Sequence, residues 1–272
     1  MELLVQGAPL YAYTGGKAFK PGQPTVVFIH GVLCDHSVWI LQSRFLAHHG
    51  WNVLALDLPG HGRSQGTPPA SVEEAAELIG PLLDAAGVDT AALVGHSWGS
   101  LIALEAAARL GPRISHAALV GTAFPMKVSP ALPEAAQTDP RRAIGMINQF
   151  SWSTLAPPPS ALGPGTWLHG ASTALNRRVQ ASNTAHNLLH RGFLACDRYA
   201  GGLEAARQGS ARLLFLLGAA DQMTPPRAAK ALMNEARAHG RDVTVATVPV
   251  GHHQMTEAPD ATLQALRAFL AG

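Results

Sequence analysis

The sequence has few charged residues, few aromatic residues and only two cysteines. Charged residues occupy 14% of the 272 positions and hydrophobic residues 47%, a composition that excludes a disordered chain or a coiled coil. Lys and Arg (20) exceed Asp and Glu (18) by only two, so the charge balance gives no reason to expect a nucleic acid as partner. Cys34 and Cys196 are too few and too far apart for a disulfide-based scaffold.

Segments that would carry the chain into or across a membrane are also missing. Residues 1–6 lack the basic start of a secretory signal, and no uninterrupted apolar run approaches the ~18 residues of a spanning helix. The sequence therefore predicts a soluble, cytoplasmic protein without a membrane partner. Its length suits one α/β domain with an insertion.

What the sequence does contain is an alternation of strand and helix patterns. Short, β-branched apolar runs predict buried parallel strands, and apolar residues at helical spacing follow most of them. The predicted strands are 25–29, 53–56, 91–94, 117–120, 213–217 and 243–248, and the predicted helices are 38–49, 71–87 with a kink at Pro81, 98–110, 224–240 and 259–270. This α/β pattern implies a mainly parallel sheet with helices on both faces, which binds ligands at the carboxyl ends of its strands.

The alternation breaks between about residues 122 and 209. This stretch has no strand-like runs, and its helical patterns are 141–150, 171–189 and 203–207, interrupted by Pro157-Pro158-Pro159 and Gly163-Pro164-Gly165. We interpret it as an inserted helical lid. The expected division is a core of residues 1–122 and 210–272 and a cap of residues 123–209.

A nucleophile is predicted at Ser97. Gly95-His96-Ser97-Trp98-Gly99 follows a strand and opens a helix, the setting in which a tight turn lifts a serine hydroxyl out of a sheet. The flanking glycines avoid clashes with the neighbouring backbone, and the helix N-terminus favours developing negative charge. The five-residue string alone is a weak signal, so its place after a strand carries the prediction.

A serine nucleophile needs a base, and the base needs an acid that fixes its tautomer. His252 follows the last predicted strand and can return over the same sheet edge, whereas the side chain of its rival, His253, should point elsewhere. Asp221 follows another buried strand, and the end of strand 117–120 offers no acid. Asp57 also ends a strand, but we expect it to tie down the loop that follows.

An acyl-transfer intermediate needs two backbone N–H groups that converge on its oxyanion. One should be that of Trp98, directly after the nucleophile, and the other that of Val32 in the turn after strand 25–29. We expect His30 to brace this turn.

These residues resemble the α/β-hydrolase fold family, in its capped, single-domain branch. The matching motifs, in the family's order, are His30-Gly31 with Trp39, Asp57 to Ser64, the Gly95 to Gly99 elbow, Gly218-Ala219-Ala220-Asp221, and Gly251-His252 with Glu257 and Pro259. The resemblance implies an eight-stranded, mostly parallel sheet flanked by helices, with an inserted α-helical cap and no cofactor.

The identity of the nucleophile narrows the range of activities that this resemblance implies. Haloalkane dehalogenases and epoxide hydrolases of the family carry Asp at the elbow and dienelactone-type hydrolases carry Cys, so Ser97 disfavours these activities. Proline iminopeptidases usually have a longer Gly-Gly-Pro oxyanion loop, from which Gly31-Val32-Leu33 departs.

Apolar side chains of the lid are predicted to line a pocket for an acyl or aryl group. The candidate substrate-binding residues are Phe124, Met126, Phe150, Trp152 and Trp167, with a place in the core of the lid as the alternative for each. His186 and His190 have metal-ligand spacing but no acidic partner in their helix, so no metal site is expected.

The predicted function is hydrolysis of carboxylic esters with a small or medium, apolar acyl or aryl group, through Ser97, His252, Asp221 and an acyl-enzyme. Three alternatives stay open: hydrolysis of a carbon–carbon bond, acyl transfer to peroxide or another acceptor by the same triad, and a small-molecule receptor with incidental turnover. A small-molecule substrate is the expected partner. The sequence predicts no oligomeric state.

Overall fold

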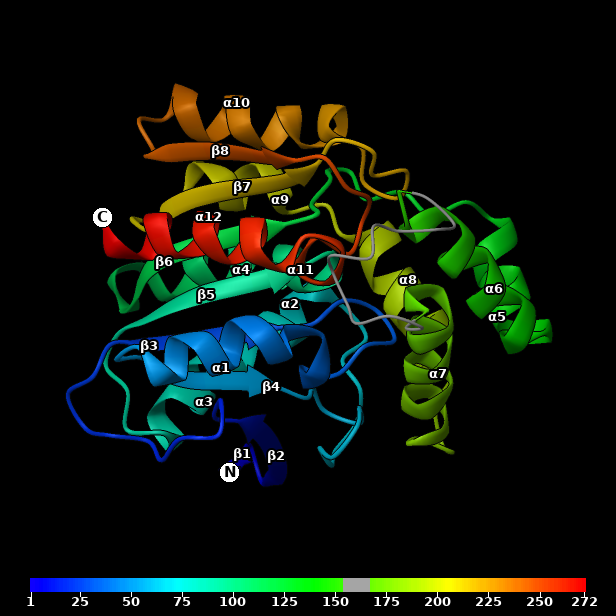
Figure 1. Ribbon diagram of the computed structural model, residues 1–272, viewed down its shortest axis with the longest axis horizontal. Coiled ribbons are helices and arrows are strands. Elements are labelled where there is room, and N and C mark those ends of the chain that lie inside the picture. The colour runs from blue at the N-terminus through cyan, green and yellow to red at the C-terminus, as the bar shows by residue number, and fades with distance from the viewer. Residues whose placement is uncertain (154–166) are drawn as a thin grey trace.

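The computed structural model describes residues 1–153 and 167–272, and its strands form one eight-stranded sheet (Figure 1). The strand order is β1-β2-β4-β3-β5-β6-β7-β8, antiparallel from β1 to β4 and parallel from β4 to β8. The strands are β1 (Glu2–Val5), β2 (Ala8–Tyr13), β3 (Thr25–Ile29), β4 (Asn52–Leu56), β5 (Ala91–His96), β6 (Ile114–Val120), β7 (Arg212–Gly218) and β8 (Val243–Val248). The predicted mostly parallel sheet is confirmed.

The parallel strands are near-continuous apolar runs because helices cover both faces of the sheet. Every residue of β3, β4 and β5 is buried. β8, at the edge, is largely exposed or half-buried. Sequence patterns predicted each parallel strand but missed the hairpin of β1 and β2, whose turn needs a positive φ at Gln6 and Gly7.

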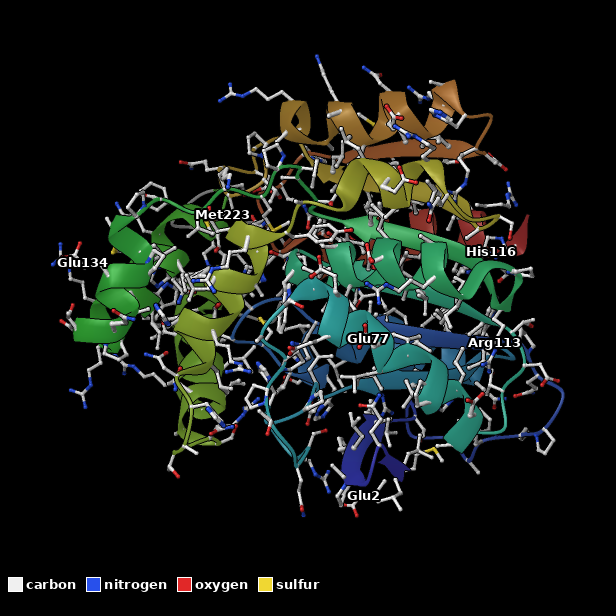
Figure 2. The ribbon with its side chains drawn as sticks, turned by 180° about the vertical axis from the view of Figure 1, so that it is seen from behind. Glu2, Glu77, Arg113, His116, Glu134 and Met223 are labelled. Carbon is white, nitrogen blue, oxygen red and sulfur yellow. The ribbon has the colours of Figure 1, made fainter. Side chains whose placement is uncertain are left out.

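Two layers of helices sandwich the sheet, each over its own apolar cluster. One face carries η1 (His36–Trp39), α1 (Ile40–His48), α11 (Gln254–Glu257) and α12 (Pro259–Ala271) (Figure 1). The other carries α2 (Val72–Glu77), α3 (Ile79–Ala85), α4 (Trp98–Leu110), α9 (Gly202–Arg207), η4 (Pro226–Ala229) and α10 (Lys230–Ala238), and the short η2 (Gly111–Arg113) follows α4. Figure 2 shows this second layer from its outer side, with Glu77 of α2 labelled. Glu77 pairs with Arg109 of α4 (2.8 Å).

The predicted helix 71–87, kinked at Pro81, is wrong in detail. It consists of α2 and α3, which meet at Leu78. Pro81 lies in the first turn of α3, where the missing N–H breaks no hydrogen bond within the helix. The boundary therefore lies before the proline rather than at it.

A group of four helices lies beyond the carboxyl ends of the parallel strands, in the connection from β6 to β7 (Figure 1). It consists of α5 (Ala131–Thr138), α6 (Pro140–Ser151), α7 (Leu168–Ala181) and α8 (Leu188–Arg198). They share an apolar cluster with Leu33 of the loop after β3. By contrast, α9 of the same connection packs against α4 and α10 beside the sheet. The predicted interruptions at 157–159 and 163–165 lie outside the described residues.

The predicted helix 171–189 is also wrong, because it is divided between α7 and α8. Asn183 accepts hydrogen bonds from the N–H groups of Ala185 (3.1 Å) and His186 (2.9 Å) and so stabilises a turn. Asn187 then caps α8 by accepting from the N–H of His190 (3.0 Å). Across the described ranges, no helix combines the length and apolarity needed to cross a bilayer.

Candidate active site

Ser97 lies on a sharp turn between β5 and α4, as the sequence predicts. Its φ of 54° and ψ of −118° are rarely adopted by residues other than glycine. A Cβ atom at Gly95 would overlap the carbonyl group of Gly99, and one at Gly99 would overlap the carbonyl oxygen of Ile29. Both glycines are therefore needed for the turn that presents the hydroxyl.

His252 and Asp221, which follow the two last strands of the sheet, are in direct contact. The Nδ1 atom of His252 lies 2.8 Å from Oδ2 of Asp221, and both side chains are buried. Because an ionised carboxylate only accepts hydrogen bonds, Nδ1 carries the proton and Nε2 is free to accept one. The pair thus holds the imidazole in the tautomer that a general base requires.

The Asp221 carboxylate is fixed by its own loop. The N–H groups of Met223 and Thr224 donate to Oδ1 (2.8 Å each), and the Thr224 hydroxyl donates to Oδ2 (2.7 Å). Burial alone would raise the pKa of Asp221, but the charge and hydrogen bond of His252 and the hydrogen bonds from Thr224 outweigh it and hold the pKa below its ordinary value. The acid therefore remains ionised.

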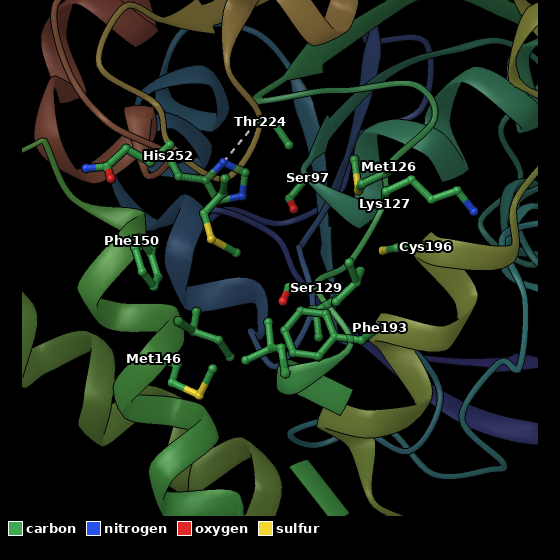
Figure 3. Close-up of a pocket in the computed structure, with 16 residues that line it drawn as sticks. Ser97, Met126, Lys127, Ser129, Met146, Phe150, Phe193, Cys196, Thr224 and His252 are labelled. Carbon is green, nitrogen blue, oxygen red and sulfur yellow. Dashed lines mark hydrogen bonds between the residues drawn. The ribbon is translucent and has the colours of Figure 1, made fainter. Parts of the chain in front are cut away.

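Ser97 and His252 line one cavity of about 350 Å³ (Figure 3). Two predicted pocket residues, Met126 and Phe150, lie on its wall. The other lining residues are Val32, Lys127, Val128, Ser129, Leu132, Met146, Ile147, Phe193, Cys196, Gln222, Met223 and Thr224. Met146 and Phe150 are four residues apart on α6 and therefore share a helix face. This spacing is the sequence pattern that could have predicted Met146 as a lining residue.

The other three predicted aromatic residues lie outside the cavity wall, and the structure corrects the predicted pocket there. Phe124 packs on Tyr199, with 5.9 Å between ring centroids. Trp152 is buried and stacks on His253 (4.9 Å). Trp167 is 63% exposed. Apolar character does not say which way a side chain points, so composition could not separate these residues from Met126 and Phe150.

The turn after β3 lies against the nucleophile. A Cβ atom at Gly31 would lie 2.9 Å from Nδ1 of His96 and 3.2 Å from Cβ of Ser97, so a side chain at this position would require its neighbours to shift. Val32 follows on the cavity wall, and the N–H of Trp98, first residue of α4, has no acceptor within the helix. His30 braces the turn as expected, donating from Nδ1 to the Gly31 carbonyl (2.8 Å) and accepting the Leu58 N–H at Nε2 (3.1 Å).

Asp57 ties down its loop, as predicted, by accepting hydrogen bonds from the backbone N–H groups of His36 (2.8 Å) and Arg63 (2.9 Å). Asp35, His36 and Asp57 bring potential metal-ligating atoms within 4.8 Å of one another. These atoms already have partners, because His36 Nδ1 contacts Asp57 (2.7 Å) and Arg178 pairs with Asp35 (2.7 Å). The donor set therefore fits a network of hydrogen bonds with one ion pair, Arg178–Asp35, better than a metal centre.

Buried histidines near the site predict a loss of stability in mild acid. Burial, together with neighbouring His30, lowers the pKa of His61 to about 3, and burial with neighbouring His252 lowers that of His253 to about 3. In the unfolded chain each of these imidazoles has a pKa near 6.5. Between about pH 6.5 and pH 3 the unfolded chain therefore binds more protons than the folded chain. Stability should fall by about 1 kcal/mol per histidine between pH 6.5 and about 5.5, as measured by urea unfolding.

The variant His253→Gln should reduce this slope, and His239→Gln, at an exposed position, should leave it unchanged. Equal free energies of unfolding at the two pH values would contradict the prediction.

Comparisons with known proteins agree with this architecture. A family model described as the alpha/beta hydrolase fold matches residues 24–259. The chain is 38% identical over 114 residues to the dihydrolipoyllysine-residue acetyltransferase component of the acetoin cleaving system of Cupriavidus necator (40% of this chain, 28% of that protein). It is 39% identical over 88 residues to an epoxide hydrolase of Caballeronia sordidicola (31% and 26%). The chain thus matches only about a quarter of the length of these curated relatives.

Among solved structures, an esterase from Exiguobacterium antarcticum superimposes with a TM-score of 0.82 at 17% identity, over 100% of this chain and 99% of that one. This likeness concerns the fold. Since the family model extends from before β3 to the start of α12 and includes the elbow, the acid loop and the histidine loop, the chain belongs to the alpha/beta hydrolase fold family.

Proposed function

We propose that this protein is a serine hydrolase that cleaves carboxylic esters with a small or medium, apolar acyl or aryl group. One observation carries the proposal: Ser97, on its strained turn, lines the same cavity as His252, whose Nδ1 is held by the buried Asp221. A serine and an oriented imidazole beside a cavity are the parts that acyl transfer needs.

In the proposed mechanism, Nε2 of His252 takes the proton of Ser97 as Oγ attacks the ester carbonyl carbon. The oxyanion accepts hydrogen bonds from the N–H groups of Val32 and Trp98. His252 then gives its proton to the departing alcohol, leaving an acyl group on Ser97. Water repeats the attack with His252 as base, and the acid product leaves. Asp221 stabilises the imidazolium in both halves.

We propose that α5 to α8 form a cap over this site, within an insertion of residues 123–209 between core segments 1–122 and 210–272. Two contacts join α7 to the loop after β3 and support this role: Asn176 Nδ2 donates to the Leu33 carbonyl (2.9 Å), and Arg178 pairs with Asp35 (2.7 Å). The apolar cluster of the cap also includes Leu33.

The lining of the cavity that contains Ser97 and His252 supports an apolar substrate. Met126, Met146 and Met223 contribute unbranched, polarisable side chains, which adapt to substrates of different shape. Phe150 and Phe193 add flat apolar surface. A volume of about 350 Å³ lies at the lower end of small-molecule pockets, which suits a short acyl chain or an aryl group.

A serine nucleophile also separates the proposed reaction from epoxide opening. A carboxylate that opens an epoxide forms an ester, which water can hydrolyse. Ser97 would form an ether, which lacks an electrophilic carbonyl carbon and would block the enzyme. Ester cleavage is therefore the better proposal, although several relatives, including that of Caballeronia sordidicola, are named epoxide hydrolases.

Labelling with a fluorophosphonate, with the modified residue mapped by mass spectrometry, tests this function beside a panel of aryl and alkyl esters. We expect the label on Ser97 and turnover of short apolar esters. Ser129→Ala is a matched control, because Ser129 lines the same cavity away from the elbow, and this variant should still be labelled. A label on another residue, or an unlabelled protein that cleaves none of the esters, would contradict the proposal.

A further inference from the structure

A second, smaller cavity of about 30 Å³ also reaches Ser97 and His252. Four polar residues line it that do not line the larger cavity: His96, Ser151, Asn176 and His253. Space of this size holds one or two water molecules, but not an acyl chain. The small cavity therefore suits a small polar reactant.

His96 lines this cavity, and one nitrogen of its imidazole can accept a hydrogen bond. Its Nε2 atom lies 2.8 Å from the carbonyl oxygen of His252, and because a carbonyl only accepts, Nε2 carries the proton. Nδ1 therefore presents a lone pair. His96 is 1% exposed, and Nδ1 has no hydrogen-bond partner among residues 1–153 and 167–272.

A buried acceptor without a partner is unfavourable, and such groups are commonly satisfied by a bound water molecule. Nδ1 of His96 also lies beside the nucleophile, since a Cβ atom built at Gly31 would be 2.9 Å from Nδ1 and 3.2 Å from Cβ of Ser97. The ring centroids of His96 and His252 are 4.7 Å apart. A hydroxyl compound in the small cavity is therefore close to both imidazoles.

We propose that the small cavity binds the water molecule that attacks the acyl-enzyme, and that Nδ1 of His96 accepts one of its two O–H groups. This inference rests on the proposed serine hydrolase function. Nε2 of His252 takes the other proton as the water oxygen bonds to the acyl carbon. The bond from that carbon to Oγ of Ser97 then breaks, Oγ regains a proton from His252, and the carboxylic acid leaves.

This arrangement favours water over alcohols as the acyl acceptor. An alcohol has a single O–H, which must point at His252 to be deprotonated, so it leaves the His96 acceptor unsatisfied. Water has two O–H groups and can donate one to each imidazole. His96 thereby directs the acyl-enzyme towards hydrolysis rather than transfer to an alcohol.

The test is the ratio of methyl ester to free acid formed from one aryl ester in a fixed mixture of water and methanol. Both products arise from the same acyl-enzyme, so slower acylation or a less well placed His252 cancels in the ratio. His96→Asn and His96→Leu form a matched pair of similar shape. Both variants lose the hydrogen bond from Nε2 to the carbonyl oxygen of His252. Asparagine keeps an acceptor near the position that Nδ1 occupies in the wild type, and leucine does not.

We expect His96→Leu to raise the ratio of methyl ester to acid about tenfold, the scale of one lost hydrogen bond in a transition state. His96→Asn should stay within about twofold of the wild type. Equal ratios in the leucine variant and the wild type would overturn the role of His96. Absence of an acyl-enzyme in the wild type would instead overturn the proposed function.

Cysteine variants test the same cavity without changing His96. Cys34 lines only the smaller cavity and Cys196 only the larger one, and both are buried. Cys34→Ala should make room for the methyl group and raise the ratio of methyl ester to acid about threefold, whereas Cys196→Ala should leave it unchanged. The same ratio in Cys34→Ala and the wild type would place the attacking molecule elsewhere.

Discussion

Replacing Ser97 with alanine should lower kcat for a short aryl ester by about 10⁴- to 10⁶-fold. The substitution removes the oxygen that forms the acyl-enzyme, and alanine has no group that could replace it. The cavity wall is otherwise unchanged, so substrate binding should be retained. Stopped-flow release of the aryl alcohol measures both the loss of turnover and the loss of any initial burst.

Two controls make the Ser97 result specific. Circular dichroism should show the native fold, because the substitution to alanine removes only the hydroxyl oxygen and disrupts no packing contact of the core. Ser129→Ala, on the same cavity wall, should keep its activity within a few fold. Ester hydrolysis by Ser97→Ala at the wild-type rate would exclude the proposed mechanism.

The variant Asp221→Asn should lower kcat by about 10⁴-fold, the loss known from other serine hydrolases when the acid is made an amide. Oδ1 accepts the N–H groups of Met223 and Thr224 and so keeps the side chain in place. The new NH₂ group would then face Nδ1 of His252 and donate to it. This interaction moves the imidazole proton to Nε2, which can no longer accept the proton of Ser97.

Thr224→Val gives a matched comparison for Asp221. It removes the hydroxyl that donates to Oδ2 (2.7 Å) but keeps the carboxylate beside His252. The same hydroxyl also lies 3.1 Å from Nδ1 of His252. We expect a loss of only about tenfold, because these two contacts are missing while the carboxylate still holds the imidazole. Steady-state kinetics at several pH values measures both variants. Activity of Asp221→Asn within about tenfold of the wild type would show that another group orients His252.

Local sequence patterns predicted the central part of the fold. The run 25–29 coincides with β3, since a strand buried on both faces needs a near-continuous apolar run. The run 243–248 coincides with the edge strand β8, whose β-branched residues favour a strand although most of them are exposed or half-buried. Helix α4 has the predicted bounds, because the sharp turn at Ser97 precedes it and Gly111, with a positive φ of 53°, ends it. In contrast, the hairpin of β1 and β2 has short strands with mixed patterns, which do not predict strands.

The inserted helices were predicted less well. Helical periodicity continues through 171–189, and only the side chains of Asn183 and Asn187, which hydrogen-bond to the backbone, divide it into α7 and α8. The pocket prediction met a similar limit. Trp152 turns towards His253 and Phe150 towards the cavity, although they are two residues apart.

By itself, the amino-acid sequence determined the order of strands and helices, the glycines that allow the strained turn at Ser97, and the places of Asp221 and His252 at strand ends. These features depend on short-range backbone sterics and on periodic burial, which neighbouring residues specify. Only the tertiary structure decided which side chains line the two cavities and that Nδ1 of His96 lacks a partner among the residues that the structure describes. Such contacts join segments that are distant in the chain, and their geometry arises when the sheet and the helices beyond it pack together.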